Sequence, residues 1–161
     1  MDIQKQWPKI REHFSKSFGS SLHVSIASVN ADGDPQCTPI GSLFLNDDQS
    51  GFYFEKYPST LPKFAKESPR ICVLGVNSSK SFWLRSLYKD KFSAFPAVKL
   101  YGQLGEKRKA TESELNALRK RMRKTSILKG HKTLWGKMES VREVRFSKAE
   151  RVKFGKMTRL E

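Results

Sequence analysis

The stretch that decides the fold is HVSIASVNADGDPQCTPIGSLFL, residues 23–45. LHVSIASV (22–29) is short, rich in β-branched residues and alternates between apolar and polar side chains, which predicts a strand. NADGDP (30–35) predicts a turn, because Asn, Asp and Gly tolerate positive φ angles and Pro35 restarts an extended chain. The β structure therefore begins with a strand that turns back on itself.

The second strand covers about residues 36–45. Pro39 and Gly41 fall inside it, and both residue types predict a break or a bulge in a strand. A further turn over NDDQSG (46–51) leads into GFYFE (51–55), which is the third strand. These connections are too short for crossover helices, so the three strands form an antiparallel meander.

An amphipathic helix is predicted before the first strand, over residues 1–18. Its apolar residues follow one another at steps of three and four, which places them on one face. They are Trp7, Ile10, Phe14 and Phe18. Gly19 is the expected end of this helix, so residues 1–19 form an N-terminal helical segment.

The rest of the chain supplies further strands and two more helices. The predicted elements are a short helix over 59–67, a strand buried on both faces over 70–76, an irregular aromatic segment over 77–96, a strand over 97–107, a helix from 111 to about 124, and strands over 141–146 and 150–154. Thr111 and Glu114 form a capping box for the longer helix. We expect a single domain, 1–161, in which residues 22–158 form a mainly β barrel of six to seven antiparallel strands with flanking α-helices.

Composition restricts the class of protein. The 161 residues carry a formal net charge of +15, which concentrates anions: a phosphorylated cofactor, an acidic substrate, nucleic acid or an acidic partner could each exploit it. No run of about 18 apolar residues exists, so we expect no membrane span. The N-terminus lacks a signal-peptide core, and we expect a cytoplasmic protein. Cys37 and Cys72 are expected to be buried thiols, and the spacing of His and Cys predicts no metal site.

Several segments resemble the pyridoxamine 5′-phosphate oxidase-like family. Residues 23–45 resemble its opening hairpin with a D-G-x-P turn, and 51–76 resemble its next unit, in which an aromatic strand leads to a Ser-led short helix, a Pro and a buried strand. VKLYGQLGE (98–106) and the closing segment 141–158 are similar to later elements of the family. The resemblance implies a split β-barrel that binds FMN at the interface of a homodimer.

The resemblance also implies where the FMN phosphate sits, on the second strand and in the Ser-led segment. Thr38, Ser59, Thr60 and Lys63 are its candidates here. The basic residues that the oxidases carry on that strand and after that serine are absent, so we expect Lys63 to supply charge near the start of the short helix. A hydroxyl of Ser59 or Thr60 that only caps the helix is the alternative.

Further candidates surround the same expected site. The second strand runs under the flavin ring in the family, where Gly permits close approach, although a plain β-bulge explains the pattern equally well. The end of the third strand lies beside the same site. The alternative is that its side chains follow the ordinary inside–outside alternation of a strand that ends at the surface. A tryptophan after the longer helix has two possible roles: it stacks on the flavin, or it anchors the protein core or a subunit interface. These candidates are Pro39, Ile40, Gly41, Ser42, Phe54, Glu55, Lys56 and Trp135.

Three classes of function remain open. The first is an FMN-dependent oxidoreductase that acts on a small molecule, with the cofactor carrying the chemistry, because no Ser-His-Asp set, P-loop or G-x-G-x-x-G motif is present. The second is a split barrel that holds flavin, haem or another anionic ligand without turnover. The third is a nucleic-acid-associated module, since RKRMRK (119–124) is either a solvated helix face or a phosphate-backbone patch. The aromatic segment 82–95 is either a lid or a dimer contact.

Overall fold

One predicted strand divides into two in the structure. The computed structural model describes residues 1–56, 61, 63 and 68–158, and in it the segment 36–45 forms β2 (Pro35–Ile40) and β3 (Leu43–Leu45). Gly41 and Ser42 separate the two halves. The break that Pro39 and Gly41 predicted is confirmed.

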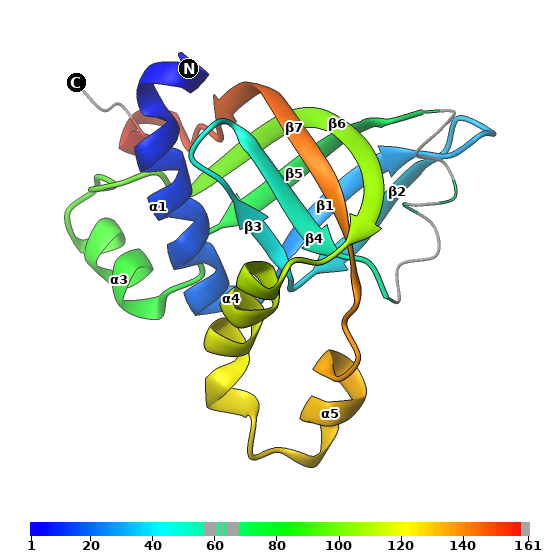
Figure 1. The fold of residues 1–161 in the computed structure, drawn as a ribbon. Helices are drawn as coiled ribbons and strands as arrows, with labels where there is room; N and C mark the ends of the chain where they lie inside the picture. The colour runs from blue at the N-terminus through cyan, green and yellow to red at the C-terminus, as the bar shows by residue number, and fades with distance from the viewer. Residues whose placement is uncertain (57–60, 62, 64–67, 159–161) are drawn as a thin grey trace.

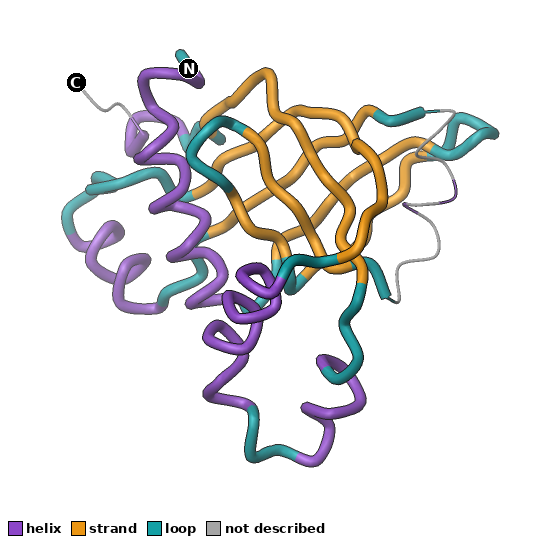
Figure 2. Tube along the Cα trace, in the orientation of Figure 1, coloured by secondary structure: helices purple, strands orange, loops and turns teal. Residues whose placement is uncertain are grey.

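Seven strands form one antiparallel sheet in the order β2-β1-β5-β6-β7-β4-β3. The remaining strands are β1 (Val24–Val29), β4 (Ser50–Phe54), β5 (Arg70–Val76), β6 (Ala97–Lys109) and β7 (Ser140–Arg151). β2 and β3 lie at opposite ends of this order although they are almost contiguous in the chain, so the sheet curls until its two edges approach one another (Figure 1 and Figure 2). The predicted fold class, a mainly β split barrel with flanking helices, is confirmed.

The turn between β1 and β2 has the predicted chemistry. Asn30 donates its backbone N–H to the carbonyl oxygen of Asp34 at 3.0 Å, and the Asp34 N–H donates to Oδ1 of Asn30 at 2.8 Å. Gly33 has a φ of 88°, which a residue with a side chain rarely adopts. The hairpin is therefore fixed by local interactions.

α1 (Ile3–Ser21) buries the predicted face against the inside of the sheet. Its four apolar residues are at most 8% exposed and belong to the main core, and they are Trp7, Ile10, Phe14 and Phe18. The helix packs closely on β5 at Gly75, where a Cβ would lie 2.9 Å from the Phe14 ring. The helix does not end at Gly19 as predicted. It continues to Ser21, and Leu22, with a φ of 64°, ends it by donating its N–H to the carbonyl of Phe18.

The segment 77–96 contains a helix, α3 (Lys80–Tyr88), beside α1 in Figure 1. The prediction of an irregular segment is wrong for these residues. Trp83 packs its ring against those of Phe92 and Phe154, with centroids 5.3 and 5.8 Å apart. Contacts with distant aromatic residues thus stabilise a helix that its own sequence pattern does not indicate.

The two predicted C-terminal strands are one continuous strand, β7. It pairs with β6 over most of its length, and the register shifts at Tyr101/Gly102, where Ser147 has no partner on β6. The strand accommodates this extra residue as a bulge and does not turn between the two predicted segments. The prediction of separate strands over 141–146 and 150–154 is therefore wrong.

β4, not β5, is the strand buried on both faces. On β5 the buried residues Ile71 and Val73 alternate with half-buried ones, so the prediction for 70–76 is wrong. On β4, Tyr53 faces the main core, whereas Phe52 and Phe54 face a second, smaller core. α4 (Glu112–Met122) supplies Leu118 and Met122 to this second core and so covers the outside of the sheet.

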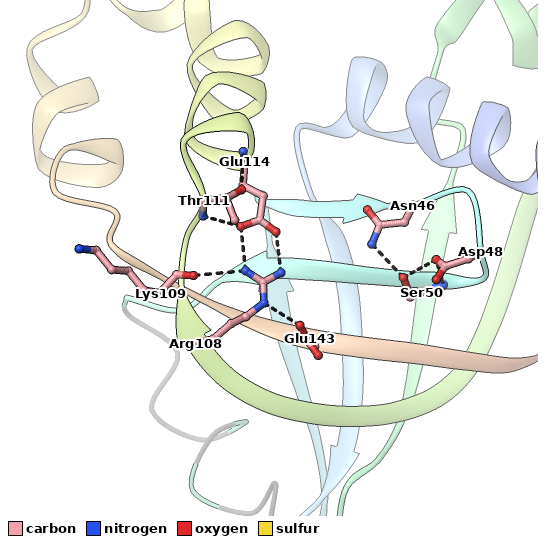
Figure 3. A network of polar contacts seen from close by, with 8 residues as sticks. All are labelled: Asn46, Asp48, Ser50, Arg108, Lys109, Thr111, Glu114 and Glu143. Carbon is pink, nitrogen blue, oxygen red and sulfur yellow. Dashed lines mark hydrogen bonds and ion pairs between the residues drawn. The ribbon is translucent and has the colours of Figure 1, made fainter.

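The predicted capping box of α4 is confirmed. The Glu114 N–H donates to the Thr111 hydroxyl at 3.3 Å, and the Thr111 N–H donates to Oε2 of Glu114 at 2.8 Å. The guanidinium of Arg108, near the end of β6, donates to both oxygens of Glu114 and to Glu143 on β7 (Figure 3). These bonds fix the start of α4 on the sheet.

The other helical elements whose bounds are fully described are α5 (Lys129–Trp135) and two 3₁₀ turns, Arg123–Thr125 and Gly155–Thr158, whereas most of the predicted short helix over 59–67 lies outside the described residues. α4 and α5 project together from one end of the barrel (Figure 1). Within the described residues, no helix combines the length and the apolar content needed to cross a membrane.

Candidate functional site

The break between β2 and β3 brings two of the predicted site residues together. Trp135, at the end of α5, lies against Gly41, where a Cβ would be 2.9 Å from Cη2 of the indole and 3.2 Å from the carbonyl oxygen of Leu22. A side chain at position 41 would have to displace the indole, so the glycine serves this close approach. Trp135 is half-buried, and it anchors α5 to the break.

Ser42 joins the sheet where the strand breaks. It is 4% exposed, and its hydroxyl donates to the carbonyl oxygen of Phe54 at 3.3 Å. The same hydroxyl accepts the N–H of Phe54 at 3.2 Å. Ser42 and Phe54 are therefore placed together, and their polar groups bind each other.

Lys56 connects the end of β4 to α5. Its Nζ donates to the carbonyl oxygens of Gly136 at 2.7 Å and Thr133 at 3.2 Å. These carbonyls lie at the C-terminal end of α5, where a cation is favourable. Lys56 thus holds the helix that carries Trp135.

Glu55 lies in a buried polar network. Simple side-chain alternation at the end of the third strand, the alternative prediction, would have left it at the surface. Its carboxylate forms a two-point ion pair with Arg142 on β7, and the two side chains are 4% and 11% exposed. The phenol of Tyr53 donates to the same carboxylate at 3.2 Å, and Lys107 lies 3.4 Å from it. Burial raises the pKa of Tyr53 and the bond to Glu55 raises that of Arg142, so both stay protonated at neutral pH. Sequence analysis missed Arg142 and Lys107, because the strand pattern alone does not indicate partners for Glu55.

β2 presents the remaining candidates of the second strand. Ile40 is buried, Thr38 is half-buried and Pro39 is exposed. Among the described strands β2 pairs only with β1, so its other edge is open. Cys37 is also exposed, so the expectation of two buried thiols is wrong for this residue, because nothing in the described part of the chain covers the outside of β2. Cys72 is half-buried, and burial raises the pKa of its thiol.

The candidates in the Ser-led segment are only partly described. Ser59 and Thr60 lie outside the described residues. Lys63 is exposed, whereas its neighbour Leu61 belongs to the main core. Within the described ranges, no group of three or more His, Cys, Asp or Glu side chains is placed to hold a metal ion.

The basic run 119–124 is not a uniform cationic face. Arg119 forms an ion pair with Glu112 at 2.7 Å, and Met122 is buried in the second core. Arg121 stacks its guanidinium over the ring of Phe44, with its carbon 3.5 Å from the ring centroid. A solvated helix face and a patch that binds the phosphate backbone of nucleic acid both require cations that point to solvent. Arg121 stacks on Phe44 instead, so neither interpretation holds for this residue.

Comparison of the sequence with protein-family models finds no match, and no curated protein is significantly similar to it. Solved structures do resemble the chain. An FMN-binding protein from Syntrophomonas wolfei has a TM-score of 0.58 at 14% identity, over 94% of this chain and 95% of that one. A candidate pyridoxamine 5′-phosphate oxidase from Lactobacillus delbrueckii has a TM-score of 0.50 at 18% identity, over 86% of this chain and 90% of that one.

HutZ, the haem storage protein from Vibrio cholerae, has a TM-score of 0.52 at 9% identity, over 89% of this chain and 92% of that one. At such identities the likeness concerns the fold alone. The chain has the split-barrel fold of the pyridoxamine 5′-phosphate oxidase-like proteins, among which different ligands occur.

The buried network around Glu55 generates a stability prediction. Replacing Glu55 by Gln keeps the volume but leaves the guanidinium of Arg142 without its counter-charge, so the free energy of unfolding should fall by about 3 kcal/mol. Glu143→Gln is the matched control, since Glu143 also pairs with an arginine but is 50% exposed, and it should cost less than about 1 kcal/mol. Urea unfolding of the three proteins measures both losses, and equal losses would contradict the structural role of Glu55.

Proposed function

We propose that this protein binds FMN at the break between β2 and β3, as a homodimer, and that the bound flavin makes it an oxidoreductase for a small molecule. Support comes from the split-barrel fold, which the chain shares with an FMN-binding protein. The net charge of +15 also favours a phosphorylated cofactor.

The observation that carries the proposal is the open edge of β2 next to an indole. β2 offers the N–H of Cys37 and the carbonyl groups of Cys37 and Pro39 on the edge that no described strand pairs, because Pro35 and Pro39 have no N–H. Trp135 lies against Gly41 at the end of the same strand and stays half-buried. A flavin ring needs hydrogen-bonding groups along its edge and an aromatic or apolar surface beside it, and this part of the barrel provides both.

In this proposal the backbone carbonyl of Pro39 binds the ring edge, Trp135 shields the ring, and Lys63 faces the phosphate. A bound flavin supplies hydride and electron transfer. The protein's own contribution is to bind, to orient and to exclude water. Lys56 contributes indirectly, because its bonds to the carbonyls of Thr133 and Gly136 position the helix that carries Trp135.

A second candidate function is ligand binding without turnover. The polar groups of Ser42, Glu55 and Lys56 are engaged with other parts of the protein, so none of these three is poised to transfer a proton to a substrate. This observation favours a storage or carrier role, such as the one named for the haem protein HutZ, over catalysis by these side chains.

The phosphate assignment predicts a selective loss of FMN affinity. Changing Lys63 to Ala removes a charge-assisted contact and should weaken FMN binding by about tenfold to a hundredfold. Riboflavin, which lacks the phosphate, should bind both proteins equally. Lys5→Ala is the control, because Lys5 is an exposed lysine on α1, and quenching of flavin fluorescence measures all the affinities.

An unchanged FMN affinity in Lys63→Ala would contradict the phosphate assignment, and a wild-type protein that binds neither flavin would contradict FMN binding itself. Adding a nicotinamide nucleotide under anaerobic conditions separates the two functions. Bleaching of the flavin absorbance supports the oxidoreductase, whereas a bound flavin that no nucleotide reduces supports the carrier.

The homodimer is also proposed from an apolar patch on the outer face of the sheet. Ala27, Cys72, Leu74 and Val76 are half-buried there, on the two neighbouring strands β1 and β5. Sedimentation equilibrium should give about twice the 18.5 kDa chain mass for the wild type, and Leu74→Lys should give a monomer. Leu87→Lys, which changes an exposed leucine on α3, should remain a dimer. A monomeric wild type would exclude the shared site.

A further inference from the structure

A pocket of about 630 Å³ lies between the end of α1, the end of α4 and α5. Its walls are mainly apolar and include Phe18, Met122 and Trp135. At its rim, Leu22, Leu128 and Leu134 are 72%, 58% and 54% exposed. A volume of this size and apolar walls are typical of pockets for small organic ligands.

Arg121 is the polar feature of this pocket. Its guanidinium lies between two aromatic rings, with its carbon 3.5 Å from the centroid of Phe44 and 4.4 Å from that of Phe18. One N–H donates to the carbonyl oxygen of Leu43, and the group carries further donors. Burial lowers the pKa of Arg121 to about 10, so the side chain remains a cation at neutral pH.

The positive charge of Arg121 has no counter-ion in the described part of the chain. None of the ion pairs among the described residues includes Arg121, in contrast to Arg108, Arg119 and Arg142. The residues described as lining the pocket include Lys124 and His131 but no aspartate or glutamate. A partly desolvated cation without an anion is unfavourable, and a ligand that brought one would relieve this cost.

We propose that this pocket binds an amphipathic organic carboxylate, with its apolar body against Phe18, Met122 and Leu134 and its carboxylate on Arg121. Guanidinium groups bind carboxylates through two parallel, charge-assisted hydrogen bonds, which an alcohol cannot form. The exposed leucines at the rim allow a chain or ring larger than the pocket to continue outward.

This site adjoins the proposed FMN site, but the proposal does not rest on FMN binding. Trp135 and Leu22 border both sites, because each lies against Gly41 and also lines the pocket. Arg121 donates to the carbonyl of Leu43 on β3, whereas the proposed FMN contacts lie on β2. Removal of the Arg121 guanidinium should therefore leave FMN bound, and removal of the Lys63 ammonium should leave the carboxylate bound.

The test compares two ligands that share an alkyl chain and differ in charge. Isothermal titration calorimetry of the full chain with decanoate and with decanol should show that decanoate binds at least about tenfold more tightly. Arg121→Met should weaken decanoate by about tenfold to a hundredfold and leave decanol unchanged. Arg119→Met is the matched control, since it removes an exposed arginine from the same helix, and it should bind decanoate like the wild type.

Leu134→Glu provides a second variant if Arg121→Met does not fold. Leu134 is an exposed rim residue, so the change should leave the fold intact and repel decanoate while FMN affinity stays constant. Equal affinities of the wild type for decanoate and decanol, or no binding of octanoate, decanoate and dodecanoate, would overturn the proposal. The proposal would also be overturned if the wild type bound no decanoate and Leu134→Glu converted a dimer to a monomer. That result would assign the pocket to contact with a second copy of the chain.

Discussion

The architecture depends on one covalent constraint, the two-residue link Gly41–Ser42 between β2 and β3. The two strands are almost contiguous in the chain but lie at opposite edges of a seven-stranded sheet. The link can be satisfied only if the sheet curls until its edges approach, so it converts a sheet into a split barrel. Ser42 then bonds to both backbone groups of Phe54, and Gly41 leaves room for the indole of Trp135.

Two ligand environments follow from this closure. On the barrel side, the open edge of β2 ends beside Trp135, and we propose that a flavin binds there. On the helical side, α1, α4 and α5 leave a pocket into which Trp135 also projects and in which Arg121 has no described carboxylate partner. Lys56 serves both environments, because it fixes the C-terminal end of α5 through the carbonyls of Thr133 and Gly136. In this proposal α5, whose C-terminal end Lys56 holds, lies between the two sites.

Local features of the fold could be predicted from the sequence, and distant partners could not. The 30–35 turn, the buried face of α1, the capping box at Thr111 and the break near Gly41 each depend on residues within a few positions of one another. The pairing of Glu55 with Arg142 spans 87 residues, so no local pattern indicated that this carboxylate is buried. In the same way, α3 forms because distant aromatic rings pack on Trp83. The sequence shows Arg121 as one cation in a basic run, because its contacts with the rings of Phe18 and Phe44 come from distant parts of the chain.

The central claim, that the break between β2 and β3 is the cofactor site, can be tested by mapping FMN onto the protein with amide and indole NMR resonances. A titration of isotope-labelled protein should shift the amides of Thr38 and Gly41 and the indole N–H of Trp135 together, with a common affinity. The amides of Leu128 and Arg121, two residues that line the pocket between α1, α4 and α5, should change little. Shifts confined to the walls of the pocket between α1, α4 and α5, or unchanged spectra at saturating FMN, would contradict the account.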